Sequence, residues 1–199
     1  NTGNFIAEIT DASIADIEGD FTISRTYNSK NDGYMSLLGR NWSFQYDEHI
    51  SANSKGELIY TLGDGKSFWF EPDGEGGYIA PQGCEYELMR IPYEVIDENK
   101  EPNEEGVIEP DIYYRYEVHQ NDGSYKQFDC YGMLQTIVSA KGLETKIEYD
   151  EFYRLTSITS PAGNTYSFTL DDLGRISAIA LPDGNAISYT YDDRSNLIE

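Results

Sequence analysis

The sequence predicts an all-β protein of antiparallel strands, and three observations support this fold class. A 21-residue period places Asp129, Asp150, Asp171 and Asp192 at the same position of successive units. Aromatic residues make up 14% of the 199 residues and include 17 Tyr, which suits half-buried strands better than helices. The 18 Gly, with many Asn, Asp and Ser, supply the turns that an antiparallel strand-turn-strand meander needs.

The N-terminal part of the chain predicts strands that precede the repeat. Residues 21–27 (FTISRTY) alternate between apolar and polar side chains, as a strand with one buried face requires. Residues 31–33 (NDG) give a turn signal, and residues 38–46 (LGRNWSFQY) predict a second, aromatic-rich strand. These segments favour an early hairpin.

A further hairpin is expected over residues 64–74 (DGKSFWFEPDG). Its phrase, D-G-x4-F-[DE]-x2-G, recurs over residues 122–132. The same hairpin pattern thus begins well before the regular repeat, which suggests one continuous sheet along the whole chain.

An acidic segment interrupts the strands at residues 97–110 (DENKEPNEEGVIEP). It is polar and contains two Pro, so it predicts a solvated excursion between residues 91–93 and a strand at residues 113–119. We therefore divide the chain into a β domain at residues 1–124, which includes this excursion, and repeat strands at residues 125–199.

Each repeat unit reads as strand, tight turn, strand, looser turn. In the third unit residues 166–170 alternate onto one face, residues 171–174 (DDLG) turn, and residues 175–181 return. Residues 182–185 (PDGN) form the looser turn. Because Asp accepts backbone N–H bonds in turns and Gly supplies positive φ, these repeated residues are interpreted as structural.

The returning strand has apolar residues three positions apart, as at Ile176 and Ile179, where simple alternation requires two. Segments this short between Pro and Gly do not favour a helix, so we expect a bulge or a strand buried on both faces. The structural positions that the repeat predicts are Asp129, Asp150, Asp171, Asp192, Gly142, Gly163, Gly184, Leu134, Leu155, Ile176 and Leu197.

The charge balance excludes several classes of partner. There are 14 Lys and Arg against 36 Asp and Glu, a net charge of −22, which disfavours nucleic acids and anionic lipid surfaces. No apolar run is long enough to span a bilayer, so no membrane insertion is expected. The chain starts without Met or an apolar leader and is expected to be part of a longer polypeptide.

No cofactor is expected. The adjacent pairs Asp171 with Asp172 and Asp192 with Asp193 are the candidates for calcium, although the chain has no D-x-D-x-D-G loop. The two cysteines, Cys84 and Cys130, are too few for a disulfide scaffold or a complete metal site, and free thiols are the simpler interpretation.

No catalytic constellation stands out, so an enzyme is not expected. The G-K-S at residues 65–67 lacks the first Gly of a phosphate-binding loop, because position 60 is Tyr. His49 and His119 have no metal-ligand spacing and no nucleophile motif beside them. Exposed aromatic residues could stack on sugars, but strand alternation favours cross-strand packing.

Three segments resemble the pattern Y-D-x-x-G-R-L of the Rhs/YD-repeat family: residues 149–155 (YDEFYRL), 170–176 (LDDLGRI) and 191–197 (YDDRSNL). Upstream, residues 1–5 (NTGNF), 10–11 (TD), 24–29 (SRTYNS) and 38–42 (LGRNW) look like the Rhs-associated domain that precedes the repeats in bacterial members. The departures are Tyr153 and Ser195 in place of the turn Gly, and Phe128 and Leu170 in place of the Tyr.

The resemblance implies a role. In that family the repeats wind into a β-strand shell that encloses a C-terminal toxin or effector, and it implies no catalytic residue in this chain. We therefore expect a non-catalytic segment that begins or caps the shell of a secreted or cell-surface bacterial protein, partnered by the remainder of the same polypeptide. The alternative is a carbohydrate- or protein-binding adhesion module at the cell surface.

Overall fold

The computed structural model describes residues 3–31, 35–97, 99–101, 103–104 and 106–199, and the described residues form strands and turns without any helix. Every strand pair is antiparallel, so the predicted all-β antiparallel fold is confirmed. The predicted turn at residues 31–33 falls on Asp32 and Gly33, which lie outside the described residues, as do Asn1 and Thr2.

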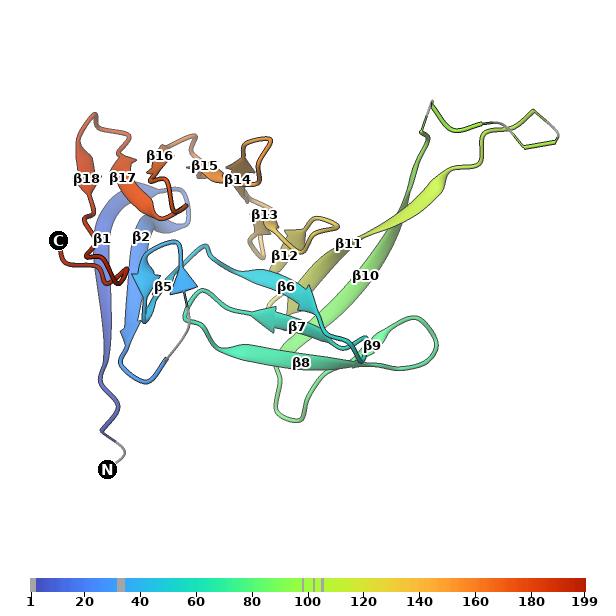
Figure 1. The fold of residues 1–199 in the computed structure, drawn as a ribbon, viewed down its shortest axis with the longest axis horizontal. Coiled ribbons are helices and arrows are strands. Elements are labelled where there is room, and N and C mark those ends of the chain that lie inside the picture. The colour runs from blue at the N-terminus through green and yellow to red at the C-terminus, as the bar shows by residue number, and fades with distance from the viewer. Residues whose placement is uncertain (1–2, 32–34, 98, 102, 105) are drawn as a thin grey trace.

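Residues 3–79, which we call the lead-in, form three small sheets (Figure 1). A long hairpin, β1 with β2, carries β5 on its second strand. A two-stranded sheet and a four-stranded sheet follow along the chain. The strands are β1 (Ile6–Asp16), β2 (Gly19–Asn28), β3 (Met35–Ser36), β4 (Gly39–Arg40), β5 (Trp42–Phe44), β6 (His49–Ala52), β7 (Leu58–Thr61), β8 (Ser67–Pro72) and β9 (Tyr78–Ile79).

The remaining strands form one nine-stranded meander, which we call the repeat sheet. Neighbours in sequence are neighbours in space throughout. This sheet starts with β10, upstream of the first 21-residue unit. Its strands are β10 (Tyr86–Val95), β11 (Asp111–Gln120), β12 (Tyr125–Phe128), β13 (Leu134–Val138), β14 (Glu144–Tyr149), β15 (Leu155–Thr159), β16 (Thr165–Leu170), β17 (Ile176–Ala180) and β18 (Ala186–Ser188).

Two expectations about the lead-in are wrong. The chain is not one continuous sheet, since the lead-in strands pair separately from the repeat sheet. Residues 38–46 do not form a single strand either, because Asn41 adopts a left-handed φ of 61° between β4 and β5. A residue at positive φ cannot continue an extended strand, so β4 pairs with β3 while β5 pairs with β2.

The three-residue apolar spacing is explained by a bulge. In β17, Ile176 pairs with Leu170 and Ala178 pairs with Thr169, which leaves Ser177 as the extra residue. The same shift occurs in β13 and β15. Because the bulge inserts one residue, Ile176 and Ile179 are both fully buried on the same side. The predicted bulge is therefore confirmed.

The main core lies between the lead-in and one face of the repeat sheet. The rings of Phe21 and Tyr166 have centroids 4.6 Å apart, and Tyr60 contacts Phe128 edge-on at 5.8 Å. Each pair joins a lead-in strand to a repeat strand, and all four residues are buried. The lead-in thus covers the apolar face of the sheet.

The acidic excursion closes a projecting arm. Strands β10 and β11 pair over ten positions, from Tyr86 with Gln120 to Val95 with Asp111. Figure 1 shows this pair extending away from the rest of the molecule, and the described residues of the excursion join the strands at its far end. Glu98, Pro102 and Glu105 of the excursion lie outside the described residues.

Candidate functional site: the contact between lead-in and repeat sheet

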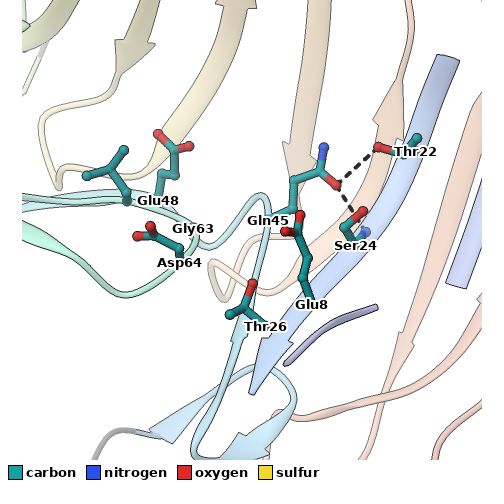
Figure 2. A pocket seen from close by; sticks show the side chains of 9 residues that line it. Glu8, Thr22, Ser24, Thr26, Gln45, Glu48, Gly63 and Asp64 are labelled. Atoms are coloured by element: carbon teal, nitrogen blue, oxygen red, sulfur yellow. Dashed lines mark hydrogen bonds between the residues drawn. The ribbon is translucent and has the colours of Figure 1, made fainter. Parts of the chain in front are cut away.

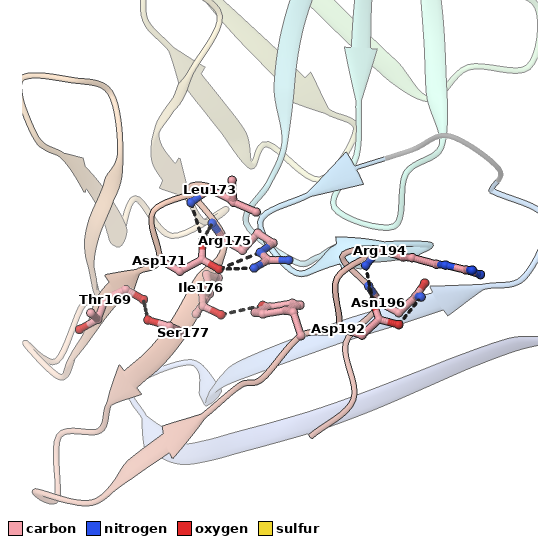
Figure 3. Close-up of polar contacts among 10 residues, drawn as sticks. Thr169, Asp171, Leu173, Arg175, Ile176, Ser177, Asp192, Arg194 and Asn196 are labelled. Carbon is pink, nitrogen blue, oxygen red and sulfur yellow. Dashed lines mark hydrogen bonds and ion pairs between the residues drawn. The ribbon is translucent and has the colours of Figure 1, made fainter.

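The Asp turn is built around one carboxylate (Figure 3). Asp171 Oδ1 accepts hydrogen bonds from the backbone N–H groups of Leu173 (3.0 Å) and Arg175 (2.9 Å). Its Oδ2 accepts the Arg175 Nε–H at 2.8 Å and pairs with the second guanidinium nitrogen at 2.6 Å. The Asp171 N–H donates to the Arg175 carbonyl, and the Gly174 N–H returns to the Asp171 carbonyl. One side chain thereby fixes the whole turn.

The other three aspartates hold the same geometry. In each, Oδ1 accepts the backbone N–H groups two and four residues further on. The partner of Oδ2 varies, and it is Gln135 for Asp129, Arg154 for Asp150 and Asn196 for Asp192. The pattern needs only a donor near the end of the turn.

These bonds lower the pKa of Asp150, Asp171 and Asp192. For Asp150 the main cause is the Arg154 side chain, and for Asp192 it is the Asn196 side chain. Burial raises the pKa of Asp171, but its bonds to Arg175 outweigh burial and the pKa is lowered. Both oxygens of these carboxylates are engaged, and no group of three His, Cys, Asp or Glu suited to a metal ion occurs within the described ranges.

The fourth turn position has left-handed φ in every unit. It is 79° at Gly132 and 77° at Gly174, and it remains left-handed at the non-glycine residues Tyr153 (59°) and Ser195 (65°). The departures from the family pattern therefore change the residue but not the backbone. A side chain in this region is strained.

The looser turns use Gly142, Gly163 and Gly184 in the same way. Their φ values are 79°, 86° and 87°, and each N–H donates to the carbonyl three residues earlier. They form the opposite edge of the repeat sheet from the Asp turns, because consecutive turns of a meander alternate between edges.

The predicted apolar positions lie in the core, with one exception. Leu134, Leu155 and Ile176 are buried, at 0%, 4% and 0% exposure. Leu197 is only half-buried, in an isolated bridge with Tyr191.

The tyrosine that precedes the Asp has a bond that the sequence pattern did not reveal. Tyr149 OH donates to the Leu134 carbonyl at 3.0 Å, and Tyr191 OH donates to the Ile176 carbonyl at 2.6 Å. Each acceptor is the apolar repeat residue fifteen positions earlier. Burial raises the pKa of both phenols. The hydroxyl thus ties one Asp turn to the strand before it.

Along the Asp-turn edge, the lead-in bonds directly to the repeat backbone. The Ile50 N–H donates to the Gly132 carbonyl at 2.9 Å, and the Ile176 N–H donates to the Leu37 carbonyl at 2.7 Å. The Arg40 N–H donates to the Ser195 carbonyl at 2.9 Å. The lead-in therefore contacts two units at the fourth turn residue, Gly132 and Ser195, and a third unit two residues further on, at Ile176.

Gly132 shows how close this approach is. A Cβ at Gly132 would collide with the Ile50 carbonyl, which is backbone and cannot move aside. At Gly142, where φ is also 79°, a Cβ would meet nothing within 4 Å. Only the first of these glycines is required by the contact with the lead-in.

At the opposite edge, Asp16 holds a looser turn. Its carboxylate accepts bonds from the Ser160 hydroxyl, the Asn164 amide (3.0 Å) and the Ala162 N–H (3.3 Å). The Ser160 bond is the main cause that lowers the pKa of Asp16. Because Asp16 ends β1, the tip of the first hairpin is anchored on the repeat.

Between the two edges, a buried ion pair links the sheets. Lys126 Nζ of β12 lies 2.7 Å from both carboxylate oxygens of Glu48, and the Tyr60 hydroxyl donates to Glu48 at 2.6 Å. Burial, then the Glu48 charge, raises the pKa of Tyr60. Such a pair is costly to leave half-made, so it specifies the register of the contact.

Arg25 forms a second link. Its Nε lies 2.8 Å from Asp11 Oδ2, and its guanidinium lies 4.5 Å from the Trp42 ring centroid and 5.5 Å from that of Tyr189. Tyr189 OH donates to Asp11 at 2.7 Å. Asp11 is the extra residue of a bulge in β1, which turns its side chain toward the repeat sheet.

Asp47 sits at the junction in a cavity of about 160 Å³, which it lines together with Leu37, His49, Met133 and Tyr153. Burial raises the pKa of the Asp47 carboxyl to about 6, although the charge of His49 opposes this. This is the one carboxyl in the contact region whose pKa is clearly raised, among the residues described.

A polar cavity of about 320 Å³ lies beside the first hairpin (Figure 2). It is lined by hydroxyls such as Thr22 and by the carboxylates of Glu8, Glu48 and Asp64. Gln45 Oε1 accepts the Ser24 N–H at 3.0 Å within it. Glu48 is already paired with Lys126, the Ser24 hydroxyl pairs with that of Thr10 at 3.2 Å, and the Thr22 hydroxyl donates to Gln45.

The other sequence candidates do not assemble a site. His49 Nδ1 lies 3.3 Å from the Asp47 carbonyl, and His119 pairs with Glu117 at 2.9 Å. Cys84 and Cys130 are both free thiols. Ser67 begins strand β8, so no helix follows the G-K-S. No helix that could cross a membrane is found in the described part of the chain.

Sequence reasoning missed the residues that join the lead-in to the repeat. Asp16 and Glu48 belong to no motif, and nothing in the segments that hold Asp11 and Arg25 shows that these two residues contact the repeat. Their partners in the repeat lie far away in the chain, up to 178 positions for Asp11. The bulge at Asp11 turns this side chain toward the repeat sheet, but a bulge at this position has no signature in the sequence.

Two family models match the chain. A Domain of unknown function (DUF6531) matches residues 1–70, which cover most of the lead-in. An RHS Repeat matches residues 131–165, which span β13 to β15. A search of curated proteins found no match. The two matches, in this order along the chain, support an Rhs/YD-repeat family protein and a structural segment of the Rhs type.

Proposed function

We propose that this chain begins or caps the β-strand shell of a protein that encloses a C-terminal toxin or effector. The observation that carries the proposal is the contact of the lead-in with successive repeat units. Backbone bonds at Gly132, Ile176 and Ser195 tie it to three Asp turns or their strands. In a shell made of similar units, the first units have no preceding unit to cover their apolar side chains. A distinct element must therefore cover them.

The covered face makes a capping role physically sensible. The repeat sheet buries Phe128, Ile158, Tyr166 and Ile179 on the side that the lead-in occupies. Left bare, such a face would promote aggregation. The lead-in therefore acts as the capping element that a repeat array requires at its terminus.

The partner in this proposal is the remainder of the same polypeptide, with further repeats and the effector. The protein would be secreted or displayed at a bacterial cell surface. The role requires no turnover, no cofactor, no nucleic acid and no membrane insertion.

A matched pair of glycine variants tests the capping contact. Gly132→Ala should lower the free energy of unfolding by roughly 1–3 kcal/mol more than Gly142→Ala, because only the first adds a collision with the lead-in. Both positions share a φ of 79°, so the backbone strain of the two variants is equal. Denaturant unfolding measures the difference. Equal losses would contradict a capping contact at Gly132.

Enclosure is tested in the complete polypeptide. Limited proteolysis should spare an enclosed effector, and Gly132→Ala should expose it by loosening the cap. The effector expressed alone is the control, because it must be digested under the same conditions. Digestion of the effector in the intact wild-type protein would contradict enclosure.

A second candidate is an adhesion module that binds carbohydrate or protein. The observation that favours it is Trp69, which is 52% exposed on β8 where a sugar ring could stack. A fluorescence titration of Trp69 with a glycan panel should show saturable binding if this role is correct. No saturation, with Trp69→Phe as the blank, rejects it.

A further inference from the structure

A row of exposed apolar residues follows the Asp-turn edge. The residue two positions after each repeat Asp is Tyr131, Phe152 and Leu173 in the first three units, with exposures of 67%, 68% and 72%. Tyr153 adds to the row, since its ring lies 4.9 Å from that of Tyr131. We call these four residues the turn stripe. Tyr153 also lines the cavity beside Asp47 of the lead-in, whereas Tyr131, Phe152 and Leu173 are not among the residues that line it.

The stripe has a regular spacing that the fold imposes. Its residues lie in the turns that join β12 to β13, β14 to β15, and β16 to β17, which are all on one edge of the meander. Successive turns on one edge are two strands apart, or about 9.5 Å. An extended ligand that crosses the strands would meet an apolar side chain at this interval.

A parallel row of negative charge accompanies the stripe. The residue one position after the repeat Asp is Glu151, Asp172 and Asp193 in the last three units, and all three are exposed. Arg154 and Arg175 pair with Asp150 and Asp171 and so leave the charges of Glu151 and Asp172 in place. The third turn carries the exposed Arg194 beside Asp193, so the row is most negative at Glu151 and Asp172.

We propose that the turn stripe binds a basic, proline-rich peptide segment in the polyproline II conformation. Such a segment has three residues per turn and rises about 3.1 Å per residue, so every third residue recurs at about 9.3 Å. That interval matches the spacing of the stripe. Prolines pack on Tyr131, Phe152 and Leu173, while Lys or Arg between them pairs with the flanking carboxylates.

The chemistry favours a peptide over a glycan. Leu173 has no ring face on which a sugar could stack, yet it packs well against a proline ring. The negative row gives a cationic ligand a gain in affinity that a neutral glycan cannot use. The preformed polyproline helix also loses little conformational entropy on binding.

Fluorescence anisotropy of a labelled synthetic peptide with repeated Arg-Pro-x-x-Pro motifs tests the proposal on the 199-residue protein. Binding should saturate, weaken with added salt, and fall about tenfold or more in Phe152→Ser and Leu173→Ser. Ile79→Ser is the matched control, because Ile79 is 57% exposed on β9, outside the stripe, and its variant should bind like the wild type.

Two further ligands make the test decisive. A peptide with Glu in place of Arg should show no saturable binding, and neither should a neutral glycan panel. The proposal is overturned by absent binding of the basic peptide, by equal binding of the Glu peptide, by glycan binding at the stripe, or by unchanged affinity in both stripe variants while their melting temperature stays native.

Discussion

At the residue scale, the repeat Asp and the Tyr that precedes it in two of the four units have different tasks. Asp171 organises its own turn through four bonds to Leu173 and Arg175. Tyr191, one position before the next Asp, bonds instead to the strand before it through the Ile176 carbonyl. The Asp therefore sets local geometry and the Tyr joins units, which explains why the two residue types recur together.

Asp171→Ala should lower the free energy of unfolding by roughly 1–2 kcal/mol, because it leaves two turn amides and the buried part of Arg175 without their acceptor. Asp172→Ala is the control, since no hydrogen bond or ion pair to Asp172 is found among the described residues, and its variant should unfold like the wild type. Urea denaturation followed by circular dichroism gives both values. A native-like midpoint for Asp171→Ala would contradict the role of the turn carboxylate.

Ser195→Gly should raise the free energy of unfolding by roughly 0.5–1 kcal/mol, because Ser195 holds a φ of 65° that only Gly adopts without strain. Ser195→Ala keeps the Cβ and hence the strain, so it should not stabilise the protein. Thermal melts of the two variants compare them directly. Stabilisation by Ala as large as by Gly would show that the hydroxyl, and not the backbone, is responsible.

At the element scale, the features that the sequence predicts correctly depend on residues close together in the chain. The turns, the alternating strands and the bulge depend on residues within one unit, so the 21-residue period reveals them. The break at Asn41 could not be predicted, because a left-handed φ at a non-glycine residue depends on the surrounding contacts. Leu38–Tyr46 therefore reads as one strand in the sequence but forms parts of two sheets.

The arm formed by β10 and β11 is supported by a third strand at its inner end only. Only residues 116–119 of β11 pair with β12, so among the described residues no further strand lies beside the outer ladder near Val95 and Asp111. A two-stranded ladder alone is marginally stable in water. The outer arm should therefore open independently of the sheet.

Native-state hydrogen exchange should show this difference. Ladder amides of the outer arm, at residues 91–95 and 111–115, should exchange faster than the ladder amides at residues 116–119 by about tenfold or more. Amides in β15 serve as the internal reference for global unfolding, because β15 is paired on both sides. Uniform protection along β11 would mean that the arm is as stable as the sheet.

At the scale of the whole molecule, the contact between lead-in and repeat lies beyond sequence reasoning. Its polar links join residues 144 and 178 positions apart, as in Asp16 with Ser160 and Asp11 with Tyr189. Pairs at such separation leave no periodic signal, and a single Asp or Arg in a strand looks like ordinary surface. The repeat predicts the sheet, whereas the cap becomes visible only in three dimensions.

The same contact predicts an unusual dependence of stability on pH. Asp16, Asp150, Asp171 and Asp192 have lowered pKa values, so the folded state binds fewer protons than the unfolded state near pH 4. Their contribution to stability is present above about pH 4 and is lost as the pH falls through the folded pKa values. Asp47 has the opposite sign, because its folded pKa is raised to about 6.

Between about pH 4 and the folded pKa of about 6, Asp47 keeps its proton in the folded protein but releases it in the unfolded chain, so stability falls as the pH rises. Asp47→Asn removes this loss and should melt at a higher temperature than the wild type above pH 6, with the two curves converging toward pH 4. Both proteins share all the other carboxylates, so the difference between their melting temperatures reports on Asp47 together with its interaction with His49. Below pH 4 both proteins should lose stability alike, because the turn carboxylates are unchanged. A difference in melting temperature that is constant from pH 4 to pH 8 at fixed ionic strength would show that Asp47 is already ionised in the folded state.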